Sequence, residues 1–98
     1  MLLDTRGSSP LHLASWAGHA DICKLLLTHP SLPADPNGLT AENETPLHFA
    51  AQHGHLTALI ELLAHGADPN IMNCRDETPL DLGAQYGEIN RDLSLVMP

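Results

Sequence analysis

Seven histidines and two cysteines are the residues of this 98-residue chain that could bind a metal ion or act as nucleophiles. Zinc sites commonly use the spacings C-x-x-C and H-x-x-x-H, because these bring two ligands to one side of a turn or helix. Neither spacing occurs here. His53 and His55 are close in sequence, but the glycine between them is expected to end a helix and to send their rings in different directions. A histidine metal site is therefore only the third of three functional hypotheses.

The two cysteines do not form a recognisable reactive pair. Cys23 lies in an apolar segment expected to be a packed helix, where a buried thiol is unreactive. Cys74 lies in a segment expected to be a loop. Two separate cysteines without a C-x-x-C motif indicate reduced thiols and a cytoplasmic protein. Because no glycine-rich phosphate loop occurs either, we expect no catalytic residues and no cofactor.

The charge balance restricts the class of partner. Twelve acidic residues oppose four basic ones, so the formal net charge is −8 at pH 7. Nucleic-acid-binding proteins present clustered Lys and Arg, and anionic membranes attract basic segments, so neither is the expected partner. Net negative charge favours another protein with a basic surface. The longest apolar run, residues 25–27 (LLL), is far too short to span a bilayer, so we expect no membrane insertion.

Three similar segments indicate which elements position these side chains. They are residues 9–14 (SPLHLA), 45–50 (TPLHFA) and 78–83 (TPLDLG). Their prolines, at positions 10, 46 and 79, are 36 and 33 residues apart, and a glycine follows each proline by eight residues. A T-P-L-H-x-A element with a period near 33 resembles the ankyrin repeat, in which a β-turn is followed by two antiparallel helices.

This resemblance implies an all-α solenoid of three helix–turn–helix repeats joined by short β-hairpins. The repeats should cover about residues 4–36, 40–72 and 73–98, so that residues 1–98 form one ankyrin-repeat domain. The third repeat is atypical, because Arg91 and Asp92 align with Ala58 and Leu59 at positions expected to be buried. We expect the chain to be a monomer and a fragment of a longer ankyrin array.

The first helix of each repeat is expected to begin at its proline, after a Ser or Thr N-cap, and to end at its glycine. In the first repeat this predicts a helix from Pro10 to Ala17. The second helices should begin near His19, His55 and Glu88. Three residues before each proline, the hairpin requires a residue type that tolerates a positive φ. These positions hold Gly7, Asn43 and Asp76.

Apolar residues at helical spacing predict the packed face of each second helix. The predicted faces consist of Ile22, Cys23, Leu25 and Leu26 in the first repeat and Leu56, Leu59, Leu62 and Leu63 in the second. The resemblance to ankyrin repeats also implies a structural role for His12 and His48, whose rings should bond to backbone groups of the loops.

In ankyrin repeats a partner protein usually contacts the hairpin tips and the exposed face of the first helices. Carried over by position, this places Trp16, Gln52 and Gln85 in one row. A neighbouring row consists of Ala17, His53 and Tyr86. Trp16 and Tyr86 resemble the aromatic anchors of interfaces, and the alternative for Trp16 is packing against a preceding repeat. The predicted contact residues of the hairpin tips are Thr5, Arg6, Ser8, Ala41, Glu42, Glu44, Cys74, Arg75 and Glu77.

A finer resemblance is to the Odin-like adaptors, which combine ankyrin repeats with SAM and phosphotyrosine-binding domains. It rests on residues 13–18 (LASWAG), 42–48 (ENETPLH), 50–55 (AAQHGH) and 77–82 (ETPLDL). It implies a cytoplasmic scaffold or adaptor in tyrosine kinase signalling. The sequence therefore predicts a non-catalytic protein–protein interaction module. The alternative is a purely structural segment of a larger ankyrin array.

Overall fold

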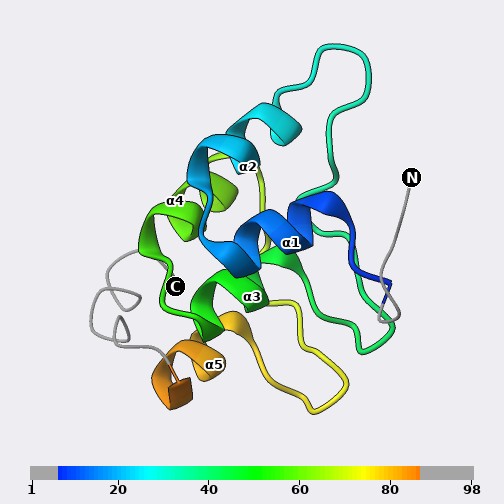
Figure 1. The fold of residues 1–98 in the computed structure, drawn as a ribbon. Helices are drawn as coiled ribbons and strands as arrows, with labels where there is room; N and C mark the ends of the chain where they lie inside the picture. Colours follow the sequence, from blue (N-terminus) through cyan, green and yellow to red (C-terminus); the bar gives the residue numbers. More distant parts are fainter. Residues whose placement is uncertain (1–6, 87–98) are drawn as a thin grey trace.

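A computed structural model describes the backbone of residues 7–86 and the side chains of residues 7–83. Within these residues the helices are α1 (Pro10–Ala17), α2 (Ala20–Leu27), α3 (Pro46–Gln52), α4 (Leu56–Ala64) and α5 (Pro79–Tyr86) (Figure 1). Residues 7–86 contain no β-strand. None of the described helices is long and apolar enough to cross a membrane.

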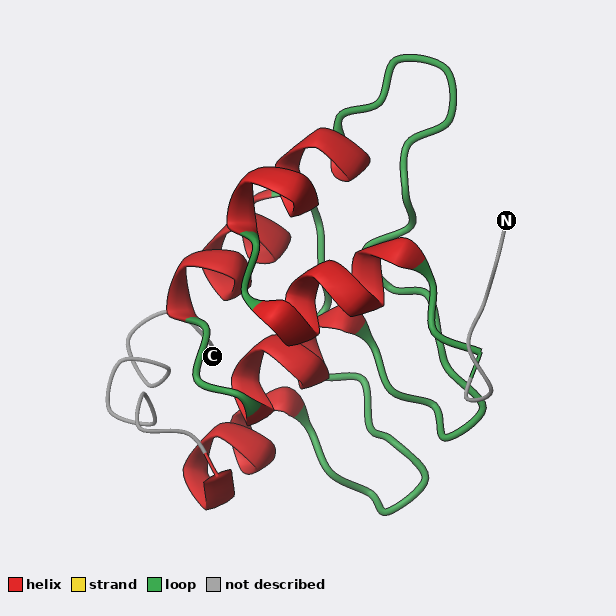
Figure 2. Cartoon of the chain, in the orientation of Figure 1, coloured by secondary structure: helices red, strands yellow, loops and turns green. Residues whose placement is uncertain are grey.

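The helices form two adjacent rows. Helix α3 lies between α1 and α5 in the first row, and α2 packs against α4 in the second (Figure 2). The loops that precede α3 and α5 both extend to the same side of the molecule (Figure 1). This arrangement confirms the predicted all-α solenoid of stacked helix pairs, and it puts the first helices and the loop tips next to one another.

The T-P-L-H element builds the start of each first helix. In the second repeat Pro46 occupies the first turn, where its missing N–H leaves no intrahelical hydrogen bond unmade. The Thr45 hydroxyl accepts the backbone N–H of His48 at 3.2 Å, and Nδ1 of His48 accepts the backbone N–H of Thr45 at 3.0 Å. Histidine thus takes the place that Glu or Gln has in a capping box. Ser9 and His12 make the same arrangement in α1.

The other ring nitrogen of each histidine connects its repeat to the next one. Nε2 of His12 donates to the backbone carbonyl of Glu44 at 2.9 Å, and Nε2 of His48 donates to that of Glu77 at 2.8 Å. Because Nδ1 accepts from the N-cap N–H, the neutral ring carries its hydrogen on Nε2. The structural role predicted for both histidines is confirmed.

The third repeat departs from this pattern at Asp81. Its carboxylate accepts the backbone N–H of Thr78 at 3.0 Å, which completes the start of α5. An ionised carboxylate has no hydrogen to donate to a further loop, so this position cannot repeat the link that the histidines make. The predicted second helix of this repeat, with Gly87, Glu88, Arg91 and Asp92, lies outside the described residues.

The core lies between the two rows of helices. Leu11, Leu47, Leu59, Leu62 and Cys23 are each at most 1% exposed. Complete burial of a leucine side chain contributes about 1.5–3 kcal/mol relative to leaving it in water, so these contacts dominate the packing. The predicted packed face of α4 is confirmed at Leu59 and Leu62.

The predicted packed face of α2 is only partly right. Cys23 is fully buried and Leu26 packs against the core, but Ile22 and Leu25 are 45% and 68% exposed. Leu27 is buried instead, because it lies one turn after Cys23 on the side that meets α1 and α4. Ile22 and Leu25 lie on the side of the helix that is turned away from both.

The connections before α3 and α5 are hairpin-shaped loops. In the first of them the backbone N–H of Thr40 donates to the carbonyl of Glu44 at 3.0 Å, and that of Asn43 donates to the carbonyl of Thr40 at 2.9 Å. The same two bonds recur 33 residues later in the chain. A positive φ is present at all three predicted positions, with values of 76° at Gly7, 61° at Asn43 and 60° at Asp76.

Acid pH is expected to destabilise the protein through His48. Burial lowers the pKa of His48 below its usual 6.5, although the Glu77 carbonyl opposes the shift, and a protonated Nδ1 could no longer accept the Thr45 N–H. Below pH 6.5 the unfolded chain therefore binds a proton more readily than the folded one. Stability that is present above this pH is lost as the pH falls, by up to about 1.4 kcal/mol per pH unit. Urea unfolding at neutral and mildly acid pH tests this prediction. The variant His48→Gln, which cannot be protonated at this position, should lose less stability than the wild type when the pH is lowered.

Candidate functional site

Trp16 and His53 come together on the exposed side of α1 and α3. Trp16 is 48% exposed, and its ring meets that of His53 edge-on, with 5.3 Å between ring centroids. The rings of His53 and His55 are nearly parallel with centroids 6.4 Å apart, so the expectation that they point in different directions is wrong. The reason is a contact between repeats, because Nε2 of His55 is hydrogen-bonded to the carbonyl oxygen of Trp16 at 3.1 Å.

Arg75 connects the tips of the two loops. Its guanidinium lies 3.3 Å from a carboxylate oxygen of Glu42, 3.0 Å from one of Glu44 and 2.9 Å from one of Glu77. The first two carboxylates belong to the loop before α3, and the third belongs to the loop before α5. Ala41 and Cys74 are exposed on the same loops. The structure thus places these predicted residues close together.

The hydrogen bonds of this cluster favour the charged forms of Arg75 and Glu77. The bond to Glu77, followed by that to Glu44, raises the pKa of Arg75 above its usual value. The bond from Asn73, followed by that from Arg75, lowers the pKa of Glu77 below 4.5. Solvent screens the exposed members of the cluster, so it contributes little to stability. Its main effect is to hold the two loops in a fixed relation.

Two of the predicted contact residues are not on the surface. Ser8 is fully buried and Glu44 is 6% exposed. They occupy equivalent positions, directly before the N-caps Ser9 and Thr45, where the chain turns inward from the loop tip to the helix. Ser8 therefore cannot contact a partner directly. Glu77, the third residue of this set, keeps a side chain that is 19% exposed.

The remaining predicted residues are only partly described. Thr5 and Arg6 lie outside the described residues. Gln85 and Tyr86 belong to α5, but their side chains are not among those described. The pairing of Tyr86 with Trp16 as aromatic anchors therefore stays a prediction.

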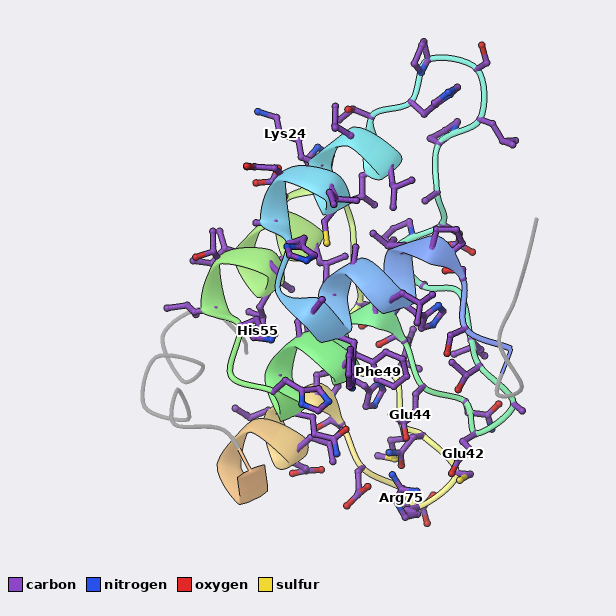
Figure 3. The ribbon with its side chains drawn as sticks, in the orientation of Figure 1. Lys24, Glu42, Glu44, Phe49, His55 and Arg75 are labelled. Atoms are coloured by element: carbon purple, nitrogen blue, oxygen red, sulfur yellow. The ribbon has the colours of Figure 1, made fainter. Side chains whose placement is uncertain are left out.

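A hollow of about 280 Å³ opens between Trp16 and the Arg75 cluster. Figure 3 shows Phe49, Glu44 and Arg75 in succession from α3 towards the loop tips, with Lys24 at the opposite end of the molecule. Phe49 is the lining residue that sequence reasoning missed. A signal was available, because Phe49 is the only phenylalanine and directly follows the T-P-L-H element. The lining consists of Trp16, Glu42, Glu44, Phe49, Gln52, His53 and Arg75.

Within residues 7–83 no three His, Cys, Asp or Glu side chains lie close enough together to hold a metal ion. Burial raises the pKa of the Cys23 thiol, which disfavours the reactive thiolate. Burial and the neighbouring His55 lower the pKa of His53 below 6.5 against the influence of Glu44, so its ring is neutral at pH 7.

Comparison with known families decides what the stacked repeats are. The family model for ankyrin repeats in many copies matches residues 31–82, which is more than half of the chain, and the model for a single ankyrin repeat matches residues 6–41. The chain belongs to the ankyrin-repeat family. Ankyrin repeats are generally protein–protein interaction modules and are typically not catalytic. Comparison with curated proteins gives no match to this ankyrin-repeat chain.

Proposed function

We propose that the chain is a non-catalytic protein–protein interaction module and that its partner docks on the binding surface formed by α1, the end of α3 and the two loop tips. The observation that carries this proposal is Trp16, a large aromatic side chain that is 48% exposed at a hollow. Aromatic residues beside a pocket are common anchors of interfaces. The edge contact with His53 holds the Trp16 ring in place, so docking would order few side chains.

A partner with a basic surface fits the charge of this region. Glu42, Glu44 and Glu77 surround a single guanidinium, that of Arg75, and the whole chain carries a formal charge of −8. Such a field accelerates the encounter with a positively charged protein, and the acceleration falls as salt is added.

We further propose that the chain works as a monomer in a cytoplasmic scaffold or adaptor, with tyrosine kinase signalling as its context. The support for the signalling context is the resemblance of residues 42–48 and 77–82 to the Odin-like adaptors. The support for the cytoplasm is the pair of separate thiols, Cys23 and Cys74.

A second candidate function, that of a structural segment in a larger ankyrin array, is favoured by the apolar side of the first repeat. Leu13 is 43% exposed and Ile22 is 45% exposed. Phe49 and Ala58, which occupy the same positions 36 residues later, are 5% and 0% exposed. In this structure the second repeat packs on the first through the side that carries Phe49 and Ala58. The equivalent side of the first repeat, which carries Leu13 and Ile22, could receive a preceding ankyrin unit in the same way, and that unit would also pack on Trp16.

Peptide selection tests the interaction module. Peptides selected from a random phage-displayed library against the immobilised chain should bind the Trp16→Ala/His53→Ala variant at least about tenfold more weakly, because anchors at a pocket carry most of the binding energy. Fluorescence polarisation with labelled peptides gives the Kd. The matched control is His19→Ala/Leu25→Ala, which removes an exposed histidine and an exposed apolar residue away from the binding surface.

The control variant should leave the Kd within about twofold, and circular dichroism should show both variants to be helical. The proposal is contradicted if only the control variant loses binding, or if no selected peptide depends on Trp16 and His53. In that case, fusion of a consensus ankyrin repeat before α1 should raise the Tm, as the second candidate requires.

A further inference from the structure

We propose that the hollow beside Trp16 receives a positively charged side chain, lysine or arginine, from the partner protein. This inference rests on the proposed function and names the chemical group that the binding surface recognises. It depends on three features of the hollow: an unsatisfied buried carboxylate oxygen, an excess of negative charge, and aromatic walls.

Glu44 supplies the unsatisfied oxygen. Its side chain is 8% exposed, and Arg75 lies 3.0 Å from Oε2. Oε1 is buried and has no hydrogen-bond partner among the described residues. A buried acceptor without a donor is unfavourable, and the penalty is larger for a charged group. Glu44 lines the hollow, so a donor that enters the hollow meets this carboxylate, and a rotation of the carboxylate would turn the covered Oε1 towards the donor.

The charges around the hollow select a cation as that donor. The carboxylates of Glu42, Glu44 and Glu77 are balanced by one guanidinium, so the cluster has two negative charges in excess. Lys24 is the other lysine or arginine among the described residues, and it lies at the opposite end of the molecule (Figure 3). An anionic group would meet this excess negative charge, and Arg75 already has three carboxylates as partners. A neutral donor would satisfy Oε1 but would leave the charge excess unchanged.

The aromatic side chains accommodate the stem of a long cationic residue. Trp16 and Phe49 line the hollow together with Glu44. Lysine and arginine pack their methylene groups on apolar surfaces while the charged end reaches a polar partner. A cation near an aromatic ring is attracted to its face, most strongly in the case of tryptophan. His53 also lines the hollow and is neutral at pH 7, so it does not repel the incoming charge.

The fluorescence of Trp16, the only tryptophan, provides a direct test. The probes are blocked pentapeptides with lysine, arginine, norleucine or glutamate between two glycines on each side. We expect saturable fluorescence changes with the lysine and arginine peptides, and a Kd for norleucine that is at least about tenfold higher, because norleucine keeps the stem and lacks the charge. The two cationic arms show which side chain the hollow prefers.

Charge-neutral variants locate the effect. Glu44→Gln, which keeps the size of the side chain, should weaken binding of the cationic peptides at least about fivefold, because it removes the buried negative charge. Asp21→Asn removes the same charge from an exposed position on α2 and should change the Kd less than about twofold. Thermal unfolding shows whether both variants remain folded. If Glu44→Gln is poorly folded, Glu42→Gln, at a half-exposed position, takes its place with a smaller expected loss.

Equal affinity for the norleucine and lysine peptides would overturn the inference. It would also be overturned if Glu44→Gln and Asp21→Asn weakened the binding of the cationic peptides equally. This failure is distinguishable from failure of the proposed function. Library-selected peptides that depend on Trp16 and His53, but not on a lysine or arginine of their own, would leave the interaction module standing and remove the cation site alone.

Discussion

Replacement of Gly18 by alanine is expected to destabilise the protein by about 3 kcal/mol, the sum of a backbone term and a packing term. Gly18 ends α1 with φ of 80°, a conformation that costs an alanine about 1–2 kcal/mol. A Cβ at this position would also lie 2.6 Å from Nδ1 of His55. The His55 ring cannot move away freely, because it is bonded to the Trp16 carbonyl and stacked on His53.

Gly66→Ala is the matched control for this prediction. Gly66 has φ of 96°, but a Cβ there would meet nothing within 4 Å, so only the backbone term of about 1–2 kcal/mol applies. Urea unfolding followed by circular dichroism measures both variants. The double variant Gly18→Ala/His55→Ala should recover part of the loss, since it removes the clash. Equal effects of Gly18→Ala and Gly66→Ala would show that the contact with His55 is unimportant.

The second large effect is expected at His48. His48→Ala should lower the free energy of unfolding by about 3 kcal/mol, since it leaves a cavity and removes the hydrogen bonds of the ring to two backbone groups. These groups are the N–H of Thr45 and the carbonyl of Glu77. Because His48 is fully buried, water cannot easily replace its ring. Chemical unfolding at neutral pH, where the ring is neutral, gives the value.

His48→Gln separates the two roles of the ring. Glutamine at this position can accept the Thr45 N–H as in an ordinary capping box, so the start of α3 is preserved. Its link to Glu77 in the next loop should be weaker, because the rigid ring that reaches the carbonyl is missing. The free energy of unfolding of His48→Gln should therefore lie between those of the wild type and His48→Ala. A glutamine variant as unstable as the alanine variant would indicate that the link between repeats dominates.

The features that sequence predicted well are those with a local backbone cause. A proline after Ser or Thr fixes the start of α1 and α3, and a positive φ requires residues such as Gly7, Asn43 and Asp76. These preferences act within a few residues, so the sequence of a single repeat is enough to predict the corresponding features of that repeat. The histidine links were predictable only through the resemblance to ankyrin repeats, because their acceptors lie 29 and 32 residues away.

The features that sequence missed depend on how one repeat meets another. Apolar spacing assigned Ile22 and Leu25 to the core, but spacing does not say which sides of a helix find a neighbour. The sequence predicted that Glu44 is part of an exposed loop tip. Only the stacking of the repeats shows that its side chain is buried and lines a hollow. Phe49 was overlooked for the same reason, since its exposure is set by α1 and the loops.

Glu44 acts as a junction of all three repeats. Its carbonyl receives the hydrogen bond of His12 from the first repeat, and its backbone N–H is bonded to Thr40 in its own loop. Its carboxylate receives Arg75 from the third repeat. The hydrogen bonds of one residue thus reach all three repeats. A substitution at position 44 removes only the carboxylate contact with the third repeat, because both backbone bonds remain, so the first two repeats stay connected through this residue.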